Sequence, residues 1–264
     1  MLFIGESING TRKSIRNAIA SGDEAFIVKL AEDQINAGSN MLDVNAGTGQ
    51  GRDETKDLVW LIELIQKNFD VPLCLDSSDS AAIDKALDVC TGVPMINSIS
   101  GEKQKLEALL PVIKSRECKV VALCIGDDGI PKTAAERLEI ARYVVDQLEQ
   151  AEVKREDIYI DPIVLSIATD TDAALVTLET MSLVKEELGV NTVLAVSNVG
   201  FGLPMRTLIN RTFIAFAVER GLDALLADIR DKSMIATVKA ARALQNKDPF
   251  CGGYLKAYRK GQLG

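Results

Sequence analysis

The sequence predicts an α/β protein of the (β/α)8 TIM-barrel class, formed by one domain of 264 residues. Eight short runs of apolar and β-branched residues recur about 20 to 40 residues apart, which is the spacing that βα units require. A helical pattern follows each run, and this alternation produces a parallel sheet with right-handed crossovers. Eight units favour a closed barrel over an open sheet, and such barrels usually contain about 250 residues.

The predicted strands are nearly continuous apolar runs, as expected for strands that are buried on both faces. They are predicted at Leu2–Asn9, Met41–Asn45, Pro72–Ser77, Pro94–Ser98, Val120–Gly126, Ile158–Pro162, Thr192–Asn198 and Ala224–Asp228. The chain contains no low-complexity segment or linker that would divide it. We therefore expect a single domain over residues 1–264, with Asn246–Gly264 as a C-terminal extension packed on its outside.

The segments between the strands carry helix signals. Glu24–Ala37 has apolar residues at helical spacing, and Gly38 is a suitable C-terminal stop. Thr133 and Glu136 form the pattern of a capping box at the start of a helix over Ala134–Ala151. Acceptor side chains near the starts of other helices are Asp53, Ser80, Asp172 and Asp231.

Composition restricts the chemistry and the partners. The chain has no histidine, which excludes Ser-His-Asp triads, histidine zinc sites and acid–base catalysis by imidazole. Its net charge of −8 argues against a nucleic-acid partner, since an acidic surface repels phosphate backbones. The basic stretch at residues 256–260 is too short to offset this charge. The five cysteines are scattered without a CxxC pair, and neither a signal peptide nor a membrane span is predicted. A cytoplasmic protein is expected.

Polar residues gather where the predicted strands end. Since active sites of such barrels lie at the carboxyl ends of the strands, these residues are expected to line one mouth. They are Glu6, Ser7, Asn9, Asp43, Asn45, Asp76, Ser77, Asn97, Ser98, Asp161, Ser197, Asn198 and Asp228. Burying unpaired polar groups costs free energy, so the ring must either bond within itself, cap the following helices or bind a ligand.

A ring of carboxylates and carboxamides suits a ligand that presents adjacent N–H donors. The 2-amino-4-oxopyrimidine edge of a pterin or a guanine is such a surface. Sugar phosphates fit less well, because they require cations or glycine-rich helix N-termini. The glycine-rich segment Ala46–Arg52 matches neither the P-loop nor the dinucleotide-binding spacing, so we interpret it as a βα loop near the mouth.

The motifs at these positions resemble the pterin-binding methyltransferases, which include the methyltetrahydrofolate:corrinoid/iron–sulfur protein methyltransferases and the folate domain of cobalamin-dependent methionine synthase. They are IGESING (4–10), LDVNAG (42–47), LCLDSS (73–78), MINSISGE (95–102), YIDP (159–162), SNVGFG (197–202) and LINRTF (208–213). The resemblance extends over essentially the whole chain, and the motifs are specific as a set rather than singly. It implies a barrel like that of dihydropteroate synthase.

The resemblance also implies roles for individual residues. Those that would bind the substrate are Asp76, Asn97, Asp161, Ser197, Asn198 and Arg206. Among them, Asn198 is the implied catalytic residue, because the family has a mobile asparagine that reaches N5 of the pterin there. Phe201 departs from the pattern, since some members have a polar residue at this place beside the pterin.

The implied activity is methyl transfer between N5 of tetrahydrofolate or 5-methyltetrahydrofolate and the cobalt of a corrinoid. N5 is a poor leaving group unless it gains positive charge, and Asn198 can stabilise its N–H form as a hydrogen-bond acceptor. Cobalt(I) is itself a strong nucleophile, which agrees with a chain that lacks histidine. A DxHxxG cobalamin motif is then impossible, so a partner protein must carry the corrinoid. The resemblance also implies a homodimer.

Three alternatives remain open from the sequence. One is dihydropteroate synthase, although that enzyme has a late Arg-x-His pattern and this chain has no histidine. Another is a non-catalytic protein that binds a pterin or docks a corrinoid protein. The third is a barrel that acts on an unrelated small acid with Mg²⁺. Its oxygen ligands would be Asp43, Asp76, Asp161 and Asp228.

Overall fold

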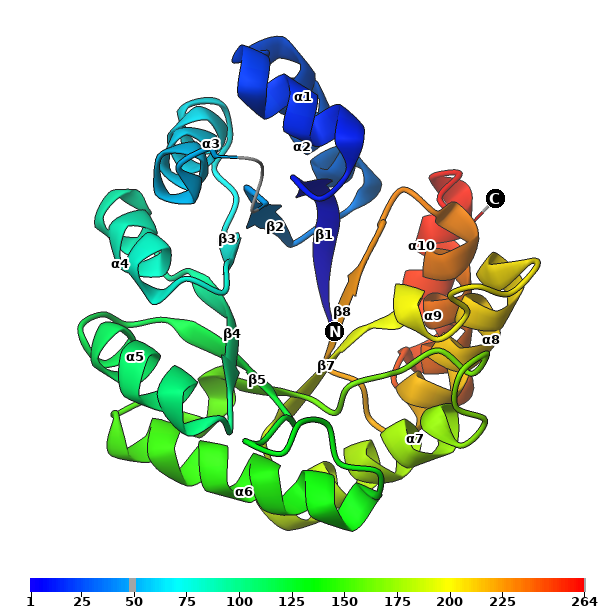
Figure 1. Cartoon of the computed structure of the whole chain (residues 1–264). Coiled ribbons are helices and arrows are strands. Elements are labelled where there is room, and N and C mark those ends of the chain that lie inside the picture. The colour runs from blue at the N-terminus through cyan, green and yellow to red at the C-terminus, as the bar shows by residue number, and fades with distance from the viewer. Residues whose placement is uncertain (48–50, 264) are drawn as a thin grey trace.

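A computed structural model describes residues 1–47 and 51–263 as a closed barrel of eight parallel strands, which confirms the predicted fold class (Figure 1). The strands neighbour one another in sequence order, and the last pairs with the first. Their bounds are β1 Leu2–Asn9, β2 Met41–Asn45, β3 Leu73–Asp76, β4 Met95–Ser100, β5 Lys119–Leu123, β6 Ile158–Asp161, β7 Asn191–Ala195 and β8 Ala224–Ala227.

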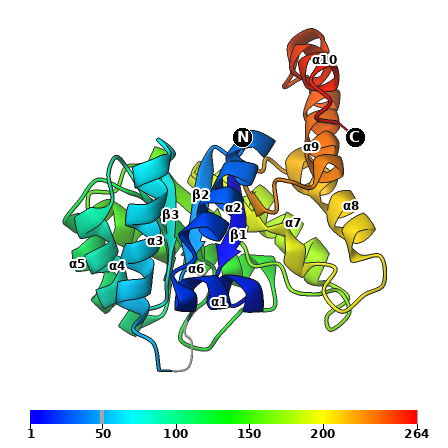
Figure 2. The ribbon, with the colours of Figure 1, turned by 90° about the horizontal axis from the view of Figure 1, so that it is seen from above.

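Helices surround this barrel on its outside (Figures 1 and 2). They are α1 Lys13–Ser21, α2 Glu24–Ala37, α3 Glu54–Asn68, α4 Ser80–Val89, α5 Lys103–Lys114, α6 Ala134–Gln150, α7 Ala173–Leu183, α8 Arg206–Glu219, α9 Lys232–Leu244 and α10 Gly252–Arg259. Short turns of 3₁₀ or π geometry occur at η1 Arg155–Asp157, η2 Val184–Leu188, η3 Val196–Asn198 and η4 Pro249–Cys251. Among these described helices, none combines the length and apolar content needed to cross a membrane.

The predicted helix signals act largely as expected. The Thr133 side chain accepts from the Glu136 backbone N–H, and Glu136 reaches back to Thr133, which confirms the capping box of α6. Asp53 and Asp231 accept backbone N–H groups at the starts of α3 and α9. Gly38 ends α2 with φ of +106°, a conformation that glycine adopts without steric cost.

Two of the predicted caps were assigned wrongly. The start of α4 is capped by Asp79, whose carboxylate accepts from the Ala81 N–H at 2.9 Å, so Ser80 is already the first helical residue. Asp172 precedes α7 but makes no side-chain capping bond, because its own backbone is in a helical conformation. An N-cap residue normally has an extended backbone, which directs its side chain toward the first N–H groups.

Five predicted strands were too long at their carboxyl ends, β3, β6 and β8 by one residue and β5 and β7 by three. β5 ends at Leu123, because the chain then turns and Gly126 bonds reciprocally with Gly129. β7 ends at Ala195, and the following residues Val196–Asn198 form the 3₁₀ turn η3. Ser197 and Asn198, which were predicted to end strand 7, therefore lie on a turn after it. Their side chains do not follow the alternation of a strand.

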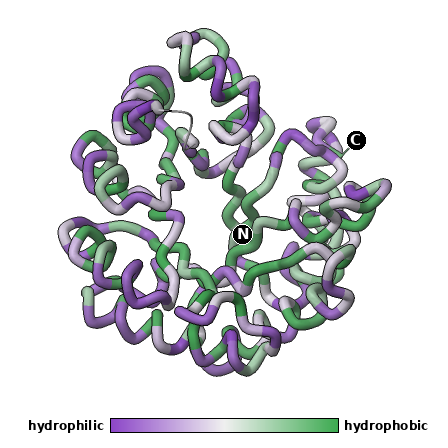
Figure 3. The backbone as a smooth tube through the Cα atoms, in the orientation of Figure 1, coloured by the Kyte–Doolittle hydropathy of each residue, from purple (hydrophilic) through white to green (hydrophobic). Residues whose placement is uncertain are grey.

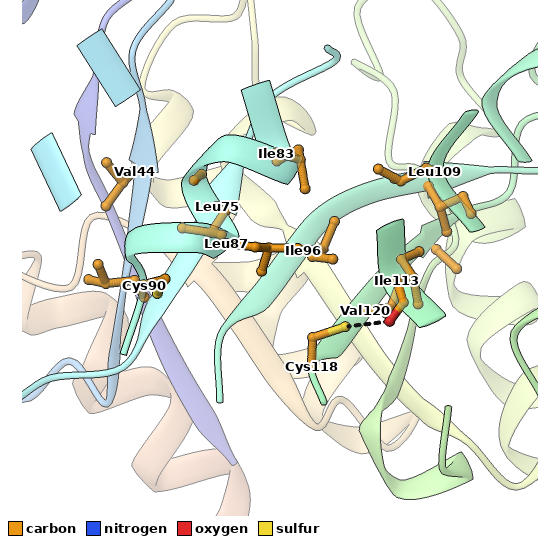
Figure 4. Packing of buried hydrophobic residues seen from close by; sticks show 14 of the residues in the cluster. Val44, Leu75, Ile83, Leu87, Cys90, Ile96, Leu109, Ile113, Cys118 and Val120 are labelled. Carbon is orange, nitrogen blue, oxygen red and sulfur yellow. Dashed lines mark hydrogen bonds between the residues drawn. The ribbon is translucent and has the colours of Figure 1, made fainter. Parts of the chain in front are cut away.

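The outer faces of the strands pack against the helices in two apolar clusters, a larger one over β1–β6 and a smaller one over β7 and β8. Figure 4 shows Leu75 of β3 and Ile96 of β4 beside Ile83 and Leu87 of α4. All four side chains are at most 2 % exposed. The tube in Figure 3 shows the same arrangement for the whole chain, with apolar residues along the strands and polar residues on the outer sides of the helices.

A third and smaller apolar cluster fills the lower interior of the barrel. It consists of Ile4, Met41, Cys74, Met95, Val121, Val193 and Ala224. Each of these residues comes from a different strand, and together they close the barrel below its mouth, as layers of branched side chains do in this fold. The lower interior of the barrel is therefore a packed apolar core.

Candidate functional site

The residues that point into the barrel change from apolar to polar along five of the strands. Side chains two residues apart lie on the same face of a strand, so the position two after each interior apolar residue also faces inward. After Ile4, Met41, Cys74, Met95 and Tyr159 these positions are Glu6, Asp43, Asp76, Asn97 and Asp161. They form a polar layer directly above the apolar floor, at the mouth where such barrels bind their ligands.

The carboxylates of β2 and β3 and the amides beside them form the densest part of this layer. Asp43 is 1 % exposed and accepts a hydrogen bond from the Asn97 Nδ2 amide at 3.2 Å. Asp76 is the register partner of Asn97 across the β3–β4 pair. The Oδ1 atom of Asn45 is buried without a hydrogen-bond partner. An orphaned acceptor in a polar layer indicates a place for a ligand donor.

Burial raises the pKa of Asp43 well above its usual range, and the charge of Asp76 raises it further, while the Asn97 amide acts in the opposite direction. Burial also raises the pKa of Asp76, although the Asn45 amide opposes this effect. Two carboxylates in a buried layer destabilise each other when both are ionised. A ligand that supplies N–H donors between them would relieve this cost.

Asp161 contributes a third carboxylate from β6. Burial raises its pKa to about 6, while a backbone bond from Ile163 and the charge of Arg137 lower it. The Ile163 N–H lies 2.7 Å from Asp161 Oδ1, which fixes the orientation of the carboxyl group. The Asp161 carboxyl group is therefore mostly ionised near neutral pH, and its Oδ1 already accepts a hydrogen bond from the Ile163 N–H.

Arg137 is a structural residue of the site that was not among the predicted site residues. Its side chain is 2 % exposed and donates to the backbone oxygens of Pro162 and Ile163 at 2.8 and 2.7 Å. It thereby anchors the segment that follows Asp161. A structural role for Arg137 could have been inferred from its position among the core-facing residues of α6, between Ala134 and Leu138. A buried cation requires partners inside the protein.

The segment between β7 and α8 forms another part of the rim. Arg206 donates from Nη2 to the Ser197 backbone oxygen at 2.7 Å, and its guanidinium lies 5.7 Å from the centre of the Phe201 ring. Asn198 lies on η3 with an exposed side chain that makes no hydrogen bond to another described residue. Its amide is therefore free to turn toward a ligand, while Arg206 stabilises the segment around it.

Glu6 lies on β1, where the charges of Asp228 after β8 and of Arg206 at the start of α8 act on it. The pKa of Glu6 is raised to about 7, mainly because the side chain is buried. The negative charge of Asp228 also raises this pKa, whereas the positive charges of Arg12 and Arg206 lower it. The Arg12 guanidinium lies 3.4 Å from Glu6 Oε1, and the Glu6 side chain is 15 % exposed. The sequence placed Glu6 in the polar ring without assigning it a role. The charges around it indicate that it is a proton-binding group near neutral pH.

Replacing Glu6 with glutamine should stabilise the fold at pH 8. Because its pKa rises from 4.5 to about 7 on folding, ionisation of Glu6 opposes folding above pH 4.5, and the full cost is present above about pH 7. We expect Glu6→Gln to raise the free energy of unfolding by about 2 to 3 kcal/mol at pH 8 and by almost nothing near pH 4.5. Chemical denaturation at both values measures this difference, with the exposed Glu63→Gln as the control. Equal stability of Glu6→Gln and the wild type at pH 8 would show that Glu6 ionises freely.

Asp228 does not join the polar layer as predicted. Its carboxylate accepts from the Arg230 guanidinium, with both oxygens at 2.8 Å, and from the Ser7 hydroxyl at 3.5 Å. These hydrogen bonds hold the Asp228 carboxylate at the rim beside β1. Within the described residues, no three Cys, Asp or Glu side chains are arranged to hold a metal ion. The four-aspartate Mg²⁺ site considered from the sequence is therefore not formed in this structure.

The structure thus places the predicted site residues in two groups. Asp76, Asn97 and Asp161 lie in the inward polar layer on β3, β4 and β6. Ser197, Asn198 and Arg206 lie on the β7–α8 segment, where the Ser197 backbone binds Arg206. Asp43, Asn45 and Glu6 complete the layer. Residues 48–50 of the glycine-rich segment lie outside the described residues.

Comparison with known proteins gives a consistent result for the sequence. Residues 5–228 match the family described as pterin binding enzymes. A methylcorrinoid:tetrahydrofolate methyltransferase of Eubacterium limosum is 31% identical over 269 aligned residues, which cover 100% of this chain and 98% of that protein. A methionine synthase of Mycobacterium tuberculosis is 28% identical over 240 residues, but this chain corresponds to only 20% of its length.

A solved structure has a similar fold. The Yersinia pestis DHPS determined with a pterine-sulfa conjugate superposes with a TM-score of 0.67, covering 93% of this chain and 94% of that one. The two sequences are 17% identical, so the likeness concerns the barrel alone.

Proposed function

This chain belongs to the pterin-binding enzymes, and from that premise we propose that it moves a methyl group between N5 of tetrahydrofolate and the cobalt of a corrinoid. The main support is the 31% identical methyltransferase of Eubacterium limosum, which aligns with the chain from end to end. The polar layer at the barrel mouth supports the folate half of the reaction. The lack of histidine agrees with a reaction in which the protein supplies neither a nucleophile nor an imidazole acid.

The composition of the layer fits the donor edge of a pterin. That edge presents an exocyclic amine and a ring N–H side by side, which carboxylates can accept in pairs. Asp76 and Asp161 would bind these donors, and Asn97 would complement the ring with its amide. The orphaned Oδ1 of Asn45 supports the same placement, since it is an acceptor that the protein itself leaves without a donor.

Asn198 would act on the reacting nitrogen. Methyl transfer to tetrahydrofolate forms the bond between N5 and the methyl carbon, breaks the bond between that carbon and cobalt, and leaves the electron pair on cobalt. N5 carries positive charge until it releases its proton, and the Asn198 carbonyl can accept a hydrogen bond from that N–H. A bond that strengthens as charge develops lowers the barrier, because it favours the transition state over the ground state.

We infer that a partner protein carries the corrinoid and docks on the β7–α8 side of the mouth. This segment exposes three large apolar side chains next to Asn198, namely Phe201, Met205 and Leu208, with exposed fractions of 65%, 75% and 56%. Exposed apolar groups beside a polar site are typical of surfaces that bind other molecules. A homodimer remains a proposal that rests on the family resemblance.

We also propose a reducing compartment such as the cytoplasm. All five cysteines are free thiols, and four of them, at positions 74, 90, 118 and 124, are buried. Burial raises the pKa of Cys90 to about 11 and that of Cys118 to about 12, so neither forms a reactive thiolate at neutral pH.

One experiment tests the activity and separates it from the alternatives. Incubation with methylcobalamin and tetrahydrofolate should convert the cobalt spectrum from the methylated to the demethylated form, at a rate proportional to protein concentration. A dihydropteroate synthase would leave that spectrum unchanged, and so would a protein that only binds pterins. A corrinoid protein in place of free methylcobalamin should react faster, because docking positions the cobalt. An unchanged spectrum with both methyl donors would overturn the proposed function.

A further inference from the structure

The helices around the barrel leave a groove between α2 and the pair α9 and α10, outside β1 and β8 (Figure 1). Two cavities of about 510 and about 220 Å³ lie there, and both are lined by Phe3 and Lys239. We call these two cavities together the outer groove. Phe3 precedes the inward-facing Ile4, so it points to the other side of the barrel wall. The outer groove is therefore separate from the mouth.

The outer groove is basic, although the protein as a whole has a net charge of −8. Its cationic side chains are Arg230, Lys232, Lys239, Arg242, Lys247 and Lys260. Only the short basic stretch at residues 256–260 was predicted from the sequence. The signal that was missed is the spacing of Lys232, Lys239 and Arg242, which are seven and three residues apart and thus share one face of α9.

The two carboxylates that line the outer groove already have partners elsewhere. Asp33 lies 2.9 Å from the ammonium of Lys29 on its own helix. Asp248 accepts the backbone N–H groups of Gly253 and Tyr254, each at 2.8 Å. Among the described residues, neither carboxylate forms an ion pair with a cation of the groove. The pKa of Asp248 is lowered mainly by these backbone bonds, and the charges of Lys239 and Arg242 also act on it and lower it further.

Most of the cations consequently lack an anionic partner. Arg230 is paired with Asp228 at 2.8 Å, and the Lys232 ammonium donates to the Gly261 backbone oxygen at 3.2 Å. Among the described residues, no ion pair includes Lys239 or Lys260. Cations gathered in a concave site without counter-charges repel one another, and a bound anion removes this repulsion.

We propose that the outer groove binds a small molecule that carries phosphate groups and an apolar moiety. Lysine ammonium groups bind phosphate as point charges, and arginine guanidinium groups bind it through paired donors. The larger cavity lies in the volume range of small-molecule sites, which exceeds what a bare phosphate would fill. Phe3, Ile229 and Ile235 supply an apolar wall for the remainder of the ligand.

Calorimetric titration of the full chain with ADP and with inorganic tripolyphosphate tests this site. Saturable binding of either probe supports the proposal, and at least tenfold tighter binding of ADP would identify a nucleotide rather than a free polyphosphate. The double variant Lys239→Gln, Lys260→Gln should weaken binding of the stronger probe at least tenfold, and Lys67→Gln on α3 should not. Thermal unfolding without ligand should be similar for all three proteins, which shows that the variants fold.

Three results would overturn the proposal. They are the absence of binding by both probes at low ionic strength, equal affinity in the wild type and the double variant, and binding of hexaglutamate in preference to both phosphate probes. The last result would mean that the groove receives an acidic protein segment. Because the outer groove is separate from the mouth, none of these results bears on methyl transfer.

Discussion

Replacing Asp161 with alanine is expected to weaken tetrahydrofolate binding about tenfold to a hundredfold at pH 7.5. A hydrogen bond to a charged group contributes about 1.5 to 3 kcal/mol, which corresponds to this range of affinity. Asp161 is half-buried in the polar layer, and its pKa of about 6 leaves it mostly ionised at this pH. Calorimetric titration of the wild type and the variant measures the change. Unchanged affinity would remove Asp161 from the proposed pterin site.

The affinity of the wild type should also decrease as the pH falls through about 6. Protonated Asp161 loses an acceptor, so the dissociation constant should rise about tenfold between pH 7 and pH 5. Asp161→Asn is the matched control, because its amide oxygen can still accept the Ile163 N–H that the carboxylate now holds at 2.7 Å. This variant should show a smaller dependence on pH. The same slope in both proteins would mean that other groups titrate.

Replacing Asn198 with alanine is expected to lower the rate constant of methyl transfer by more than tenfold. The loss of one group that stabilises charge in a transition state typically has an effect of this size or larger. Stability and folate affinity should change little, because the side chain is exposed and unbonded within the described structure. Single-turnover spectroscopy of cobalt measures the rate separately from binding.

A matched control for this substitution is Gln150→Ala, which removes an exposed carboxamide at the far end of α6. It should leave both the rate and the affinity unchanged. A rate for Asn198→Ala within twofold of the wild type would refute its catalytic role. A lower affinity with an unchanged rate would instead make Asn198 a binding residue only.

The barrel could be predicted from the sequence because its signals are local and repeated. A strand buried on both faces is an apolar run, and each of the eight runs is followed by a helical pattern. β1 and β2 begin and end where predicted. The end of β7 was missed, because the 3₁₀ turn over Val196–Asn198 continues the apolar run of the strand and has no glycine or proline to mark it.

The polar layer was predictable as a set but not in its internal partners. Asp76 and Asp161 end their strands and Asn97 lies within β4, all three at inward positions that alternation along a strand already implies. Asp228 has the same position in sequence, yet it pairs with Arg230 two residues later and is drawn to the rim. The buried contact of Arg137 with the β6–α7 segment depends on residues 25 and 26 positions away, so the local pattern indicates a cation on the core face of α6 but not its partners.

The most direct test of the account is a structure of the protein with tetrahydrofolate bound. We predict that the amino and ring N–H groups of the pterin lie within hydrogen-bond distance of the Asp76 and Asp161 carboxylates. N5 should face the β7–α8 segment, within reach of the Asn198 amide. A pterin bound in the outer groove, or bound at the mouth with its N–H edge turned away from these carboxylates, would contradict the account.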